Sequence, residues 1–249
     1  MTTTTAPVIG SVHSFDISTG VDGPGTRFVA FLAGCPLRCQ YCHSPDTWYR
    51  RSGKPTTVDE LVTEIRRYER FIKVAGGGVT LSGGEPLQQA AFSREVLARC
   101  KELGLHTALD TSGFLGDRAD DALLDATDLV LLDIKSGDPG TYRTVTRTGR
   151  LAPTIRFARR LGDRGTPIWV RFVLVPGLTD DRANVEGIAD IMTAVPTIER
   201  VEILPFHRLG AAKYTRLGLP FHLAATPPPD RTLISRVVEQ FTAAGLHAA

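Results

Sequence analysis

Residues 34–43, with the sequence GCPLRCQYCH, hold three of the four cysteines of this chain within eight positions. Cys35, Cys39 and Cys42 follow the spacing Cys-x3-Cys-x2-Cys, whereas Cys100 stands alone. The glycine and the proline at the start of the stretch disfavour regular structure, so we expect a loop whose thiols face one centre. Such crowding is typical of a metal or cluster site rather than of paired disulfides.

The choice of metal depends on how many ligands the loop can supply. Thiolates bind zinc and iron–sulfur clusters, and a structural zinc ion takes four protein ligands. His43 is a candidate fourth ligand, but the adjacent side chains of Cys42 and His43 point poorly at the same ion. Three unrelated core thiols are a further interpretation, which the low cysteine content disfavours. A 4Fe-4S cluster on three cysteines fits better and leaves one iron open to a small molecule.

Composition limits the class of protein. With 29 Lys and Arg against 27 Asp and Glu, the net charge of +2 is too even for a broad nucleic-acid surface. The hydrophobic fraction of 42% and the charged fraction of 22% are typical of a globular chain with a full core. At 249 residues, one α/β barrel domain is favoured over two small domains. We therefore expect a single domain over residues 1–249.

The sequence also bears on location. The first ten residues, MTTTTAPVIG, contain no basic group and no long apolar stretch of the kind that a secretion signal needs. Apolar runs such as 28–33 and 170–175 are far shorter than the roughly 20 residues that span a bilayer. Unpaired cysteines suit a reducing compartment. We expect a cytoplasmic protein with neither a membrane nor a nucleic acid as partner.

Short β-branched runs alternate with stretches that have apolar residues at helical spacing. The strands are expected at residues 27–33, 79–82, 105–110, 129–134, 168–175 and 201–204. The helices are expected from Thr57 to Ile72 behind a Thr57–Glu60 capping box, at 92–103, around 123–124, in a stretch ending near 161, at 181–195 and at 230–244. Six such units predict an α/β fold with a parallel sheet, a partial (βα)6 TIM-like barrel that stays open on one side.

In such a sheet the reactive side chains lie where the strands end. The cysteine loop follows the first strand, and the next strand ends in Ser82-Gly83-Gly84-Glu85-Pro86. The polar residues at the later strand ends are Asp110, Thr111, Asp133, Lys135 and His207. We expect all of these to face one rim, and Arg171, which lies within a strand, not to do so.

The stretch GCPLRCQYCHSPDTW resembles the cluster loop of radical S-adenosylmethionine (radical SAM) enzymes, whose signature is Cys-x3-Cys-x-aromatic-Cys, with Tyr41 at the aromatic position. Further blocks resemble, in order, those of the family of pyruvate formate-lyase activating enzymes. They are HSFDISTGVDGPGTRF, GGGVTLSGGEP, LDTSG, DLVLLDIK, VPGLTDD and ILPFHRLG. The resemblance covers nearly the whole chain and implies a radical SAM core.

The resemblance implies a role for each matching residue. Cys35, Cys39 and Cys42 would hold the 4Fe-4S cluster, and the turn at Gly84 would hold the methionine amino group of S-adenosylmethionine. The other contacts of this cofactor would come from Tyr41, Cys42, His43, Asp133, Ile134, Lys135 and His207. Asp110 and Thr111 would join Asp133 around a monovalent cation. Asp22 and Arg27 would contact the peptide of a protein substrate, with His43 assisting.

Each of these residues also has a structural interpretation. Asp133 and Lys135 share one side of a strand, where they could form an ion pair without a ligand. The glycine pair and the Asp22–Arg27 segment could be simple turns, and Asp110 and Thr111 could cap a turn. His207 could be a structural histidine. Cys100, on an apolar helix stripe, is expected to be a core thiol.

The function implied by the resemblance is that of a radical SAM activase. The cluster would reductively cleave S-adenosylmethionine, and the 5'-deoxyadenosyl radical would take a hydrogen atom from a glycine of pyruvate formate-lyase, installing a glycyl radical. Flavodoxin or ferredoxin would supply the electron. The alternatives are an activase of another glycyl-radical enzyme, a small-molecule radical SAM enzyme, and a non-catalytic zinc-binding module. The small number of remaining cysteines favours the pyruvate formate-lyase type.

Overall fold

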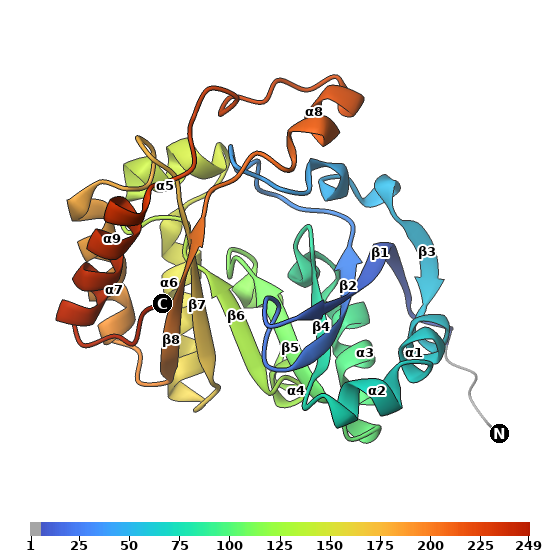
Figure 1. The fold of residues 1–249 in the computed structure, drawn as a ribbon. Helices are drawn as coiled ribbons and strands as arrows, with labels where there is room; N and C mark the ends of the chain where they lie inside the picture. Colours follow the sequence, from blue (N-terminus) through green and yellow to red (C-terminus); the bar gives the residue numbers. More distant parts are fainter. Residues whose placement is uncertain (1–5) are drawn as a thin grey trace.

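In a computed structural model, which describes residues 6–249, one eight-stranded sheet runs through the molecule in the order β3-β1-β2-β4-β5-β6-β7-β8. The strands are β1 (Ile9–Thr19), β2 (Thr26–Leu32), β3 (Lys54–Thr57), β4 (Gly78–Gly83), β5 (His106–Thr111), β6 (Leu129–Asp133), β7 (Ile168–Leu174) and β8 (Ile198–Pro205). Six of the strands, β2, β4, β5, β6, β7 and β8, are parallel and lie in chain order. The predicted parallel sheet, open on one side, is confirmed (Figure 1).

Two antiparallel strands at the edge were not predicted. β1 pairs with β2 on one side and with β3 on the other. The β1 sequence, IGSVHSFDIST, mixes polar and apolar residues and gives only a weak strand pattern. The short β3 begins with Lys-Pro, a pair of residues suited to the edge of a sheet. The expected six units therefore carry an antiparallel addition at the β2 edge.

Most of the helices cover the outer face of the sheet in Figure 1, and one short helix, labelled α8, lies above the carboxyl ends of the strands. They are α1 (Val58–Arg66), α2 (Glu69–Val74), α3 (Ala90–Glu102), α4 (Asp121–Asp125), α5 (Pro139–Thr146), α6 (Leu151–Asp163), α7 (Arg182–Thr193), α8 (Ala211–Leu217) and α9 (Arg231–Ala243). Thr57 and Glu60 form the predicted capping box at the start of α1. No helix in residues 6–249 combines the length and apolar character needed to cross a membrane.

The helices differ from the prediction in three places. The helix expected up to Ile72 is divided into α1 and α2, and the ring of Tyr68 at the break packs against Phe28 with ring centres 5.7 Å apart. The stretch ending near residue 161 is divided into α5 and α6, because the backbone at Arg147 turns into the left-handed region with φ of 61°. The short helix α8 was not predicted.

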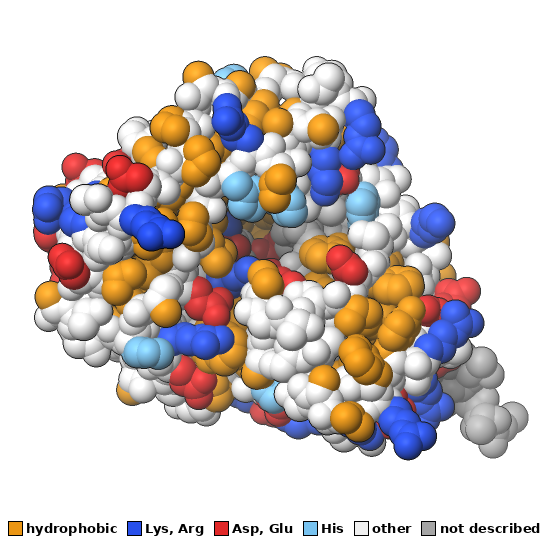
Figure 2. Space-filling view, viewed as in Figure 1, with side chains coloured by type: hydrophobic (Ala, Val, Ile, Leu, Met, Phe, Trp, Pro, Cys, Tyr) orange, Lys and Arg blue, Asp and Glu red, His pale blue; other side chains and the backbone are white. Residues whose placement is uncertain are grey.

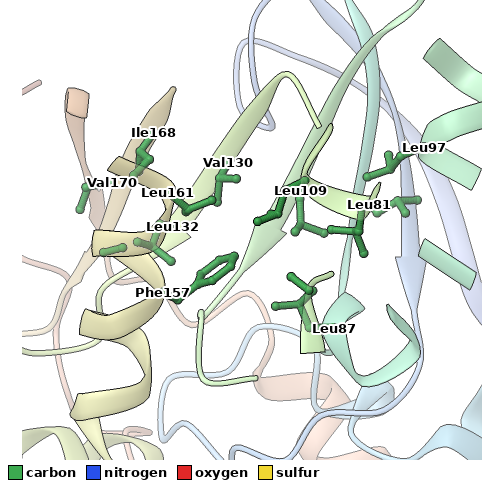
Figure 3. Close-up of a cluster of buried hydrophobic side chains, with 14 of the residues drawn as sticks. Leu81, Leu87, Leu97, Leu109, Val130, Leu132, Phe157, Leu161, Ile168 and Val170 are labelled. Carbon is green, nitrogen blue, oxygen red and sulfur yellow. The ribbon is translucent and has the colours of Figure 1, made fainter. Parts of the chain in front are cut away.

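The core fills the space between the outer face of the sheet and the helices. Leu81, Leu109 and Leu132 point outward from their strands and pack against Leu97 of α3 and Phe157 of α6 (Figure 3). Side chains alternate along a strand, so the neighbours of these leucines point inward. Near the carboxyl ends the inward residues are polar or charged, whereas further down the sheet Ala108, Leu129 and Leu131 form a separate apolar cluster.

The buried Gln89 joins the antiparallel edge to the rest of the sheet. Its Oε1 accepts a hydrogen bond from the backbone N–H of Ser11 at 2.7 Å. Its Nε2 donates to the carbonyl of Ser11 at 3.0 Å and to the carbonyl of Ala33 at 2.9 Å. This side chain therefore fixes β1 beside the segment that leads into the cysteine loop.

Replacing Gln89 with alanine should lower the free energy of unfolding by about 2 to 3 kcal/mol, because buried backbone groups lose their partners. The neighbouring Gln88 is the matched control, since its buried Oε1 has no hydrogen-bond partner in the described structure. Gln88→Ala should lower the same quantity by less than about 1 kcal/mol. Urea unfolding at constant m-value measures both, and equal losses in the two variants would contradict the role given to Gln89.

Candidate functional site

A cavity of roughly 720 Å³ opens at the carboxyl ends of the parallel strands. Its size lies in the range of small-molecule sites. Figure 2 shows the middle of this face hollowed, with histidine side chains beside the opening and acidic and basic side chains inside it. The sequence-predicted residues among those that line it are Asp22, Cys35, Cys39, Tyr41, Cys42, His43, Gly84, Asp110, Thr111, Asp133, Lys135 and His207.

The cysteine loop is held at both ends by backbone hydrogen bonds. Gly34 donates its N–H to the carbonyl of Thr47 at 2.6 Å, and Gln40 donates to that of Val145 at 2.9 Å. Between these points the side chains alternate, and Cys35, Leu37, Cys39 and Tyr41 line the cavity whereas Arg38 and Gln40 do not. Cys42 also lines the cavity and accepts a hydrogen bond on Sγ from Nε1 of Trp48 at 3.3 Å.

The three thiols lie close enough to influence one another electrically. Burial, and next the charge of Cys39, raise the pKa of Cys35. Burial also raises the pKa of Cys39 to about 12 and raises that of Cys42. Free thiolates are therefore unfavourable at this position, and a cationic centre that takes them as ligands removes the penalty.

The donor set fits a cluster better than a single ion. Within residues 6–249, no three side chains of His, Cys, Asp or Glu converge closely enough to hold one metal ion. A zinc site on Cys35, Cys39, Cys42 and His43 requires that convergence. A cluster assigns each thiolate to a different iron and so tolerates wider spacing. Cys100 is fully buried in the main hydrophobic core, as predicted.

The glycine turn after β4 brings backbone atoms to the cavity wall. Gly83 has φ of 111°, and Gly84 donates its N–H to the carbonyl of Leu32 at 2.7 Å. A Cβ atom at position 84 would lie 2.4 Å from the carbonyl oxygen of Gly34, so only glycine fits there. The turn and the cysteine loop are therefore in direct contact.

Glu85, the next residue, does not line the cavity. Its buried carboxylate accepts hydrogen bonds from the hydroxyls of Thr111 and Ser112, both at 2.6 Å, and from the backbone N–H of Ser112 at 3.0 Å. Burial raises the pKa of this carboxyl, while these hydrogen bonds act in the opposite direction. Glu85 thus fixes the end of β4 to the end of β5.

Asp133 and Lys135 form an ion pair of 2.7 Å between Oδ2 and Nζ, in which the lysine side chain is 11% exposed. Burial by itself lowers the pKa of Lys135. The carboxylate of Asp133 has the opposite effect and outweighs burial, so the pKa of Lys135 lies well above its usual value. Its Nζ is 5.7 Å from the ring centre of Tyr41. Ile134, between them, is fully buried in the main core and does not line the cavity. The expected contact of this residue with the cofactor therefore does not fit its side chain.

Sequence reasoning placed Arg171 outside the rim, but it lines the cavity. The register places it opposite Asp133 of β6 and Glu202 of β8. Its Nη1 lies 3.2 Å from Oδ2 of Asp110 and 3.8 Å from Oδ1 of Asp22. The alternation of side chains along the strand was the signal that could have placed Arg171. It points to the same face of the strand as Val173, which also lines the cavity.

Asp110 carries an unsatisfied acceptor. Its Oδ2 accepts from the hydroxyl of Ser82 at 2.6 Å, while its buried Oδ1 has no hydrogen-bond partner in the described structure. Burial raises the pKa of Asp110 to about 6, and the carboxylate of Asp133 adds to the rise, although Arg171 opposes it. Four carboxylates act on the guanidinium of Arg171, and two of them have a second cation: Asp133 pairs with Lys135, and Glu202 pairs with Arg200 at 2.9 Å.

Arg27 occupies a different place from the one expected. It lies at the start of β2, its side chain is fully buried, and it does not line the cavity. Its Nε donates to the hydroxyl of Thr80 at 3.0 Å and its Nη1 contacts Nδ1 of His106 at 2.9 Å. Contact with a partner peptide does not fit this position. Instead, the hydroxyl of Thr80 donates to the carbonyl of Asp22 at 2.7 Å, so Arg27 supports the Asp22 segment from below.

Two histidines stand at the opening. His43 and His207 are exposed, and their rings pack edge to face with centres 5.2 Å apart. Burial lowers the pKa of His43, and the charges of Lys213 and His207 lower it further. The ring of His43 is therefore favoured in the neutral form, which suits contact with an aromatic or uncharged part of a ligand.

The family model of the radical SAM superfamily matches residues 29–185, which contain the cysteine loop, the glycine turn and the Asp133–Lys135 pair. The chain is 40% identical over 232 residues to the pyruvate formate-lyase 1-activating enzyme of Escherichia coli strain K12, covering 92% of this chain and 94% of that protein. It is 44% identical over 224 residues to the pyruvate formate-lyase-activating enzyme of Clostridium pasteurianum, covering 90% and 93%.

The fold is also similar to solved structures. A radical SAM methyltransferase from Sphaerobacter thermophilus superposes with a TM-score of 0.65, covering 94% of this chain and 71% of that chain at 19% identity. At that identity the likeness concerns the fold alone.

The contact between Arg27 and His106 generates a pH prediction. Burial, and next the guanidinium of Arg27, lower the pKa of His106 below its value of 6.5 in the unfolded chain. The unfolded chain therefore binds more protons than the folded chain near pH 6, and stability falls as the pH drops from 7 to 5. His106→Asn keeps an acceptor for Arg27 without a titrating ring, so it should lose less stability over this range.

Urea unfolding of both proteins at pH 5, 6 and 7 measures the difference. Groups common to both proteins cancel in the comparison. If the free energy of unfolding changes with pH equally in both proteins, the pKa of His106 is not lowered in the folded protein.

Proposed function

Since this chain belongs to the radical SAM superfamily and, within it, to the pyruvate formate-lyase activating enzymes, we propose that its protein substrate is a pyruvate formate-lyase. It is a radical SAM enzyme whose cofactors are a 4Fe-4S cluster and S-adenosylmethionine. When bound, these cofactors supply a one-electron cleavage of the sulfonium carbon–sulfur bond and a 5'-deoxyadenosyl radical that takes a hydrogen atom from a glycine of the substrate.

The observation that carries the proposal is the single cavity shared by the three thiols, the glycine turn and the buried Asp133–Lys135 pair. We assign Cys35, Cys39 and Cys42 to three irons of the cluster. The chain then has no fourth thiol for the last iron, because Cys100 lies in the core. That iron is left to the amino and carboxylate groups of S-adenosylmethionine.

The chain's own residues orient this cofactor. The backbone at Gly84 suits its amino group, because no side chain blocks the approach. The ammonium of Lys135 suits its carboxylate, and Asp133 keeps that ammonium charged and in place. Tyr41, His43 and His207 offer ring surfaces to its nucleoside part. The protein contributes position, charge and the exclusion of other hydrogen donors.

A monovalent cation is proposed beside the cofactor. The buried and unpaired Oδ1 of Asp110 supports such a site, as does the local charge, because four carboxylates there face three cations, Arg171, Lys135 and Arg200. Asp133 faces the same cavity and would share the cation. Thr111 has its hydroxyl engaged by Glu85, so its contribution would come from its backbone oxygen.

Two partners complete the proposal. The substrate's glycine segment would enter the cavity past Asp22, whose carboxylate lies above Arg171. Flavodoxin or ferredoxin would deliver the electron. All four cysteines are free, which suits the reducing cytoplasm where these carriers work.

Alanine at position 35, 39 or 42 should each prevent assembly of the cluster, because a thiolate ligand is lost. Iron and acid-labile sulfide per chain after anaerobic reconstitution measure the effect. Cys100→Ala is the matched control and should keep full iron and sulfide content, while losing about 1 kcal/mol of stability from the buried site. A Cys39→Ala protein with full iron, sulfide and 5'-deoxyadenosine formation would refute the ligand assignment.

The substrate is tested by mixing the reconstituted protein with dithionite, S-adenosylmethionine and pyruvate formate-lyase under anaerobic conditions. We expect a glycyl-radical signal by electron paramagnetic resonance on pyruvate formate-lyase. Another glycyl-radical enzyme serves as the comparison. A radical signal on that enzyme alone would show that the substrate is a different glycyl-radical enzyme. Formation of 5'-deoxyadenosine without any protein radical would favour a small-molecule substrate.

A further inference from the structure

The outer side of the cysteine loop carries a concentration of positive charge. Residues 34–54 and 139–150 contain seven Lys or Arg residues and a single acidic residue, Asp46, although the whole chain is nearly balanced. Asp46 is paired with Lys213 at 3.1 Å, and Asp138, just before the second segment, caps α5 through its side chain. The basic residues are Arg38, Arg50, Arg51, Lys54, Arg143, Arg147 and Arg150.

The two segments form one continuous surface, which we name the basic surface. Arg38 donates its backbone N–H to the carbonyl of Thr146 at 2.9 Å, and Gln40 donates its side-chain amide to the carbonyl of Thr144 at 2.8 Å. Between residues 6 and 249, none of its seven cations lies in an ion pair. In Figure 2, basic side chains gather at the upper right, where Figure 1 draws both α8 and the light-blue segment between β2 and β3.

Stacking on aromatic rings holds part of this charge in place. The guanidinium of Arg38 lies 5.1 Å from the ring centres of both Trp48 and Tyr49, and that of Arg51 lies 4.4 Å from Tyr49. Tyr49 is 44% exposed. An exposed tyrosine between two arginines is the composition typical of a protein–protein contact.

Two side chains of the basic surface, those of Arg38 and Trp48, contact the cluster cysteines directly. Nη1 of Arg38 donates to the backbone carbonyl of Cys35 at 2.6 Å. Trp48, on which Arg38 stacks, donates its indole N–H to Sγ of Cys42. Arg38, Tyr49, Arg50 and Arg51 do not line the cavity. A protein bound here would therefore approach the cluster from behind the loop and leave the cavity opening free for the substrate.

We propose that the basic surface is the docking site of an acidic one-electron carrier protein. This inference rests on the proposed function, which requires an electron at the cluster. The carrier is oxidised by one electron and the cluster is reduced by the same electron. No proton or chemical group is transferred. Carrier complexes are weak and rely on charge for fast association, which unpaired arginines around an exposed aromatic ring supply.

The test compares two double charge reversals. Arg51→Glu/Arg143→Glu alters both segments of the basic surface without touching a residue of the cavity. Arg159→Glu/Arg182→Glu is the matched control, with the same charge change at exposed residues of α6 and α7 that lie outside the two segments of the basic surface. The probe is purified flavodoxin of net negative charge, and binding is measured by isothermal titration calorimetry.

We expect the surface variant to bind oxidised flavodoxin about tenfold or more weakly at low salt, and the control variant to change affinity less than about twofold. Added salt should weaken binding by the wild-type protein more than by the surface variant. With reduced flavodoxin, the surface variant should form 5'-deoxyadenosine more slowly, whereas with dithionite, which needs no docking, the rate should match that of the wild-type protein.

Equal loss of binding in both double variants would show a response to net charge and overturn the proposal, as would unchanged binding in the surface variant. If the double surface variant also cleaves S-adenosylmethionine more slowly with dithionite, its fold or cluster has been affected. The single variant Arg51→Glu is then tested in the same flavodoxin-binding assay, and unchanged binding there overturns the proposal. Equally strong binding of RNA or of anionic phosphatidylserine vesicles, lost in the same variant, would assign the surface to that ligand instead. A glycyl radical formed with dithionite keeps the proposed function standing in each of these cases.

Discussion

Charged side chains buried at the carboxyl end of the sheet are the constraint on which this structure depends. Asp110, Asp133 and Arg171 stand on the inner face of neighbouring strands, where an uncompensated charge is strongly unfavourable. The outer face of the same strands is a continuous hydrophobic core. The alternation of the pleat thus lets a single strand contribute to the core and to a polar cavity at once, and the charges that remain unmatched define what the cavity can bind.

Two buried side chains connect this frame to the loops above it. Gln89 fixes the antiparallel edge beside the entry to the cysteine loop, and Glu85 fixes the ends of β4 and β5 to each other. Gly84 then touches the backbone of Gly34, so the glycine turn and the cysteine loop form one unit. The positions of the thiols therefore follow from hydrogen bonds made well below the cavity, and a cluster would bind to a site that is already shaped.

Much of this was predictable, for a physical reason. Strands such as Leu129–Asp133 are buried on both faces and read as hydrophobic runs, and parallel order brings their ends to one rim. β1 was missed because its mixture of polar and apolar residues gives only a weak strand pattern. Arg27 was expected beside the partner peptide, but it lies at the start of β2, far from the carboxyl ends of the strands. The motif gives the order of its residues and does not show at which end of the strand each one lies. The single domain expected for the whole chain stays a prediction.

The cysteine loop separates two tasks by the direction of its side chains. Cys35, Cys39 and Tyr41 face the cavity, while Arg38, between the first two, faces away and stacks on Tyr49. In the proposed function, a substrate segment and an electron carrier would both come near the same cluster. Alternation along this short loop would place a cluster held by the three thiols between the cavity and the basic surface. The same loop would then line the cavity of the substrate and still leave the cluster within reach of its electron source.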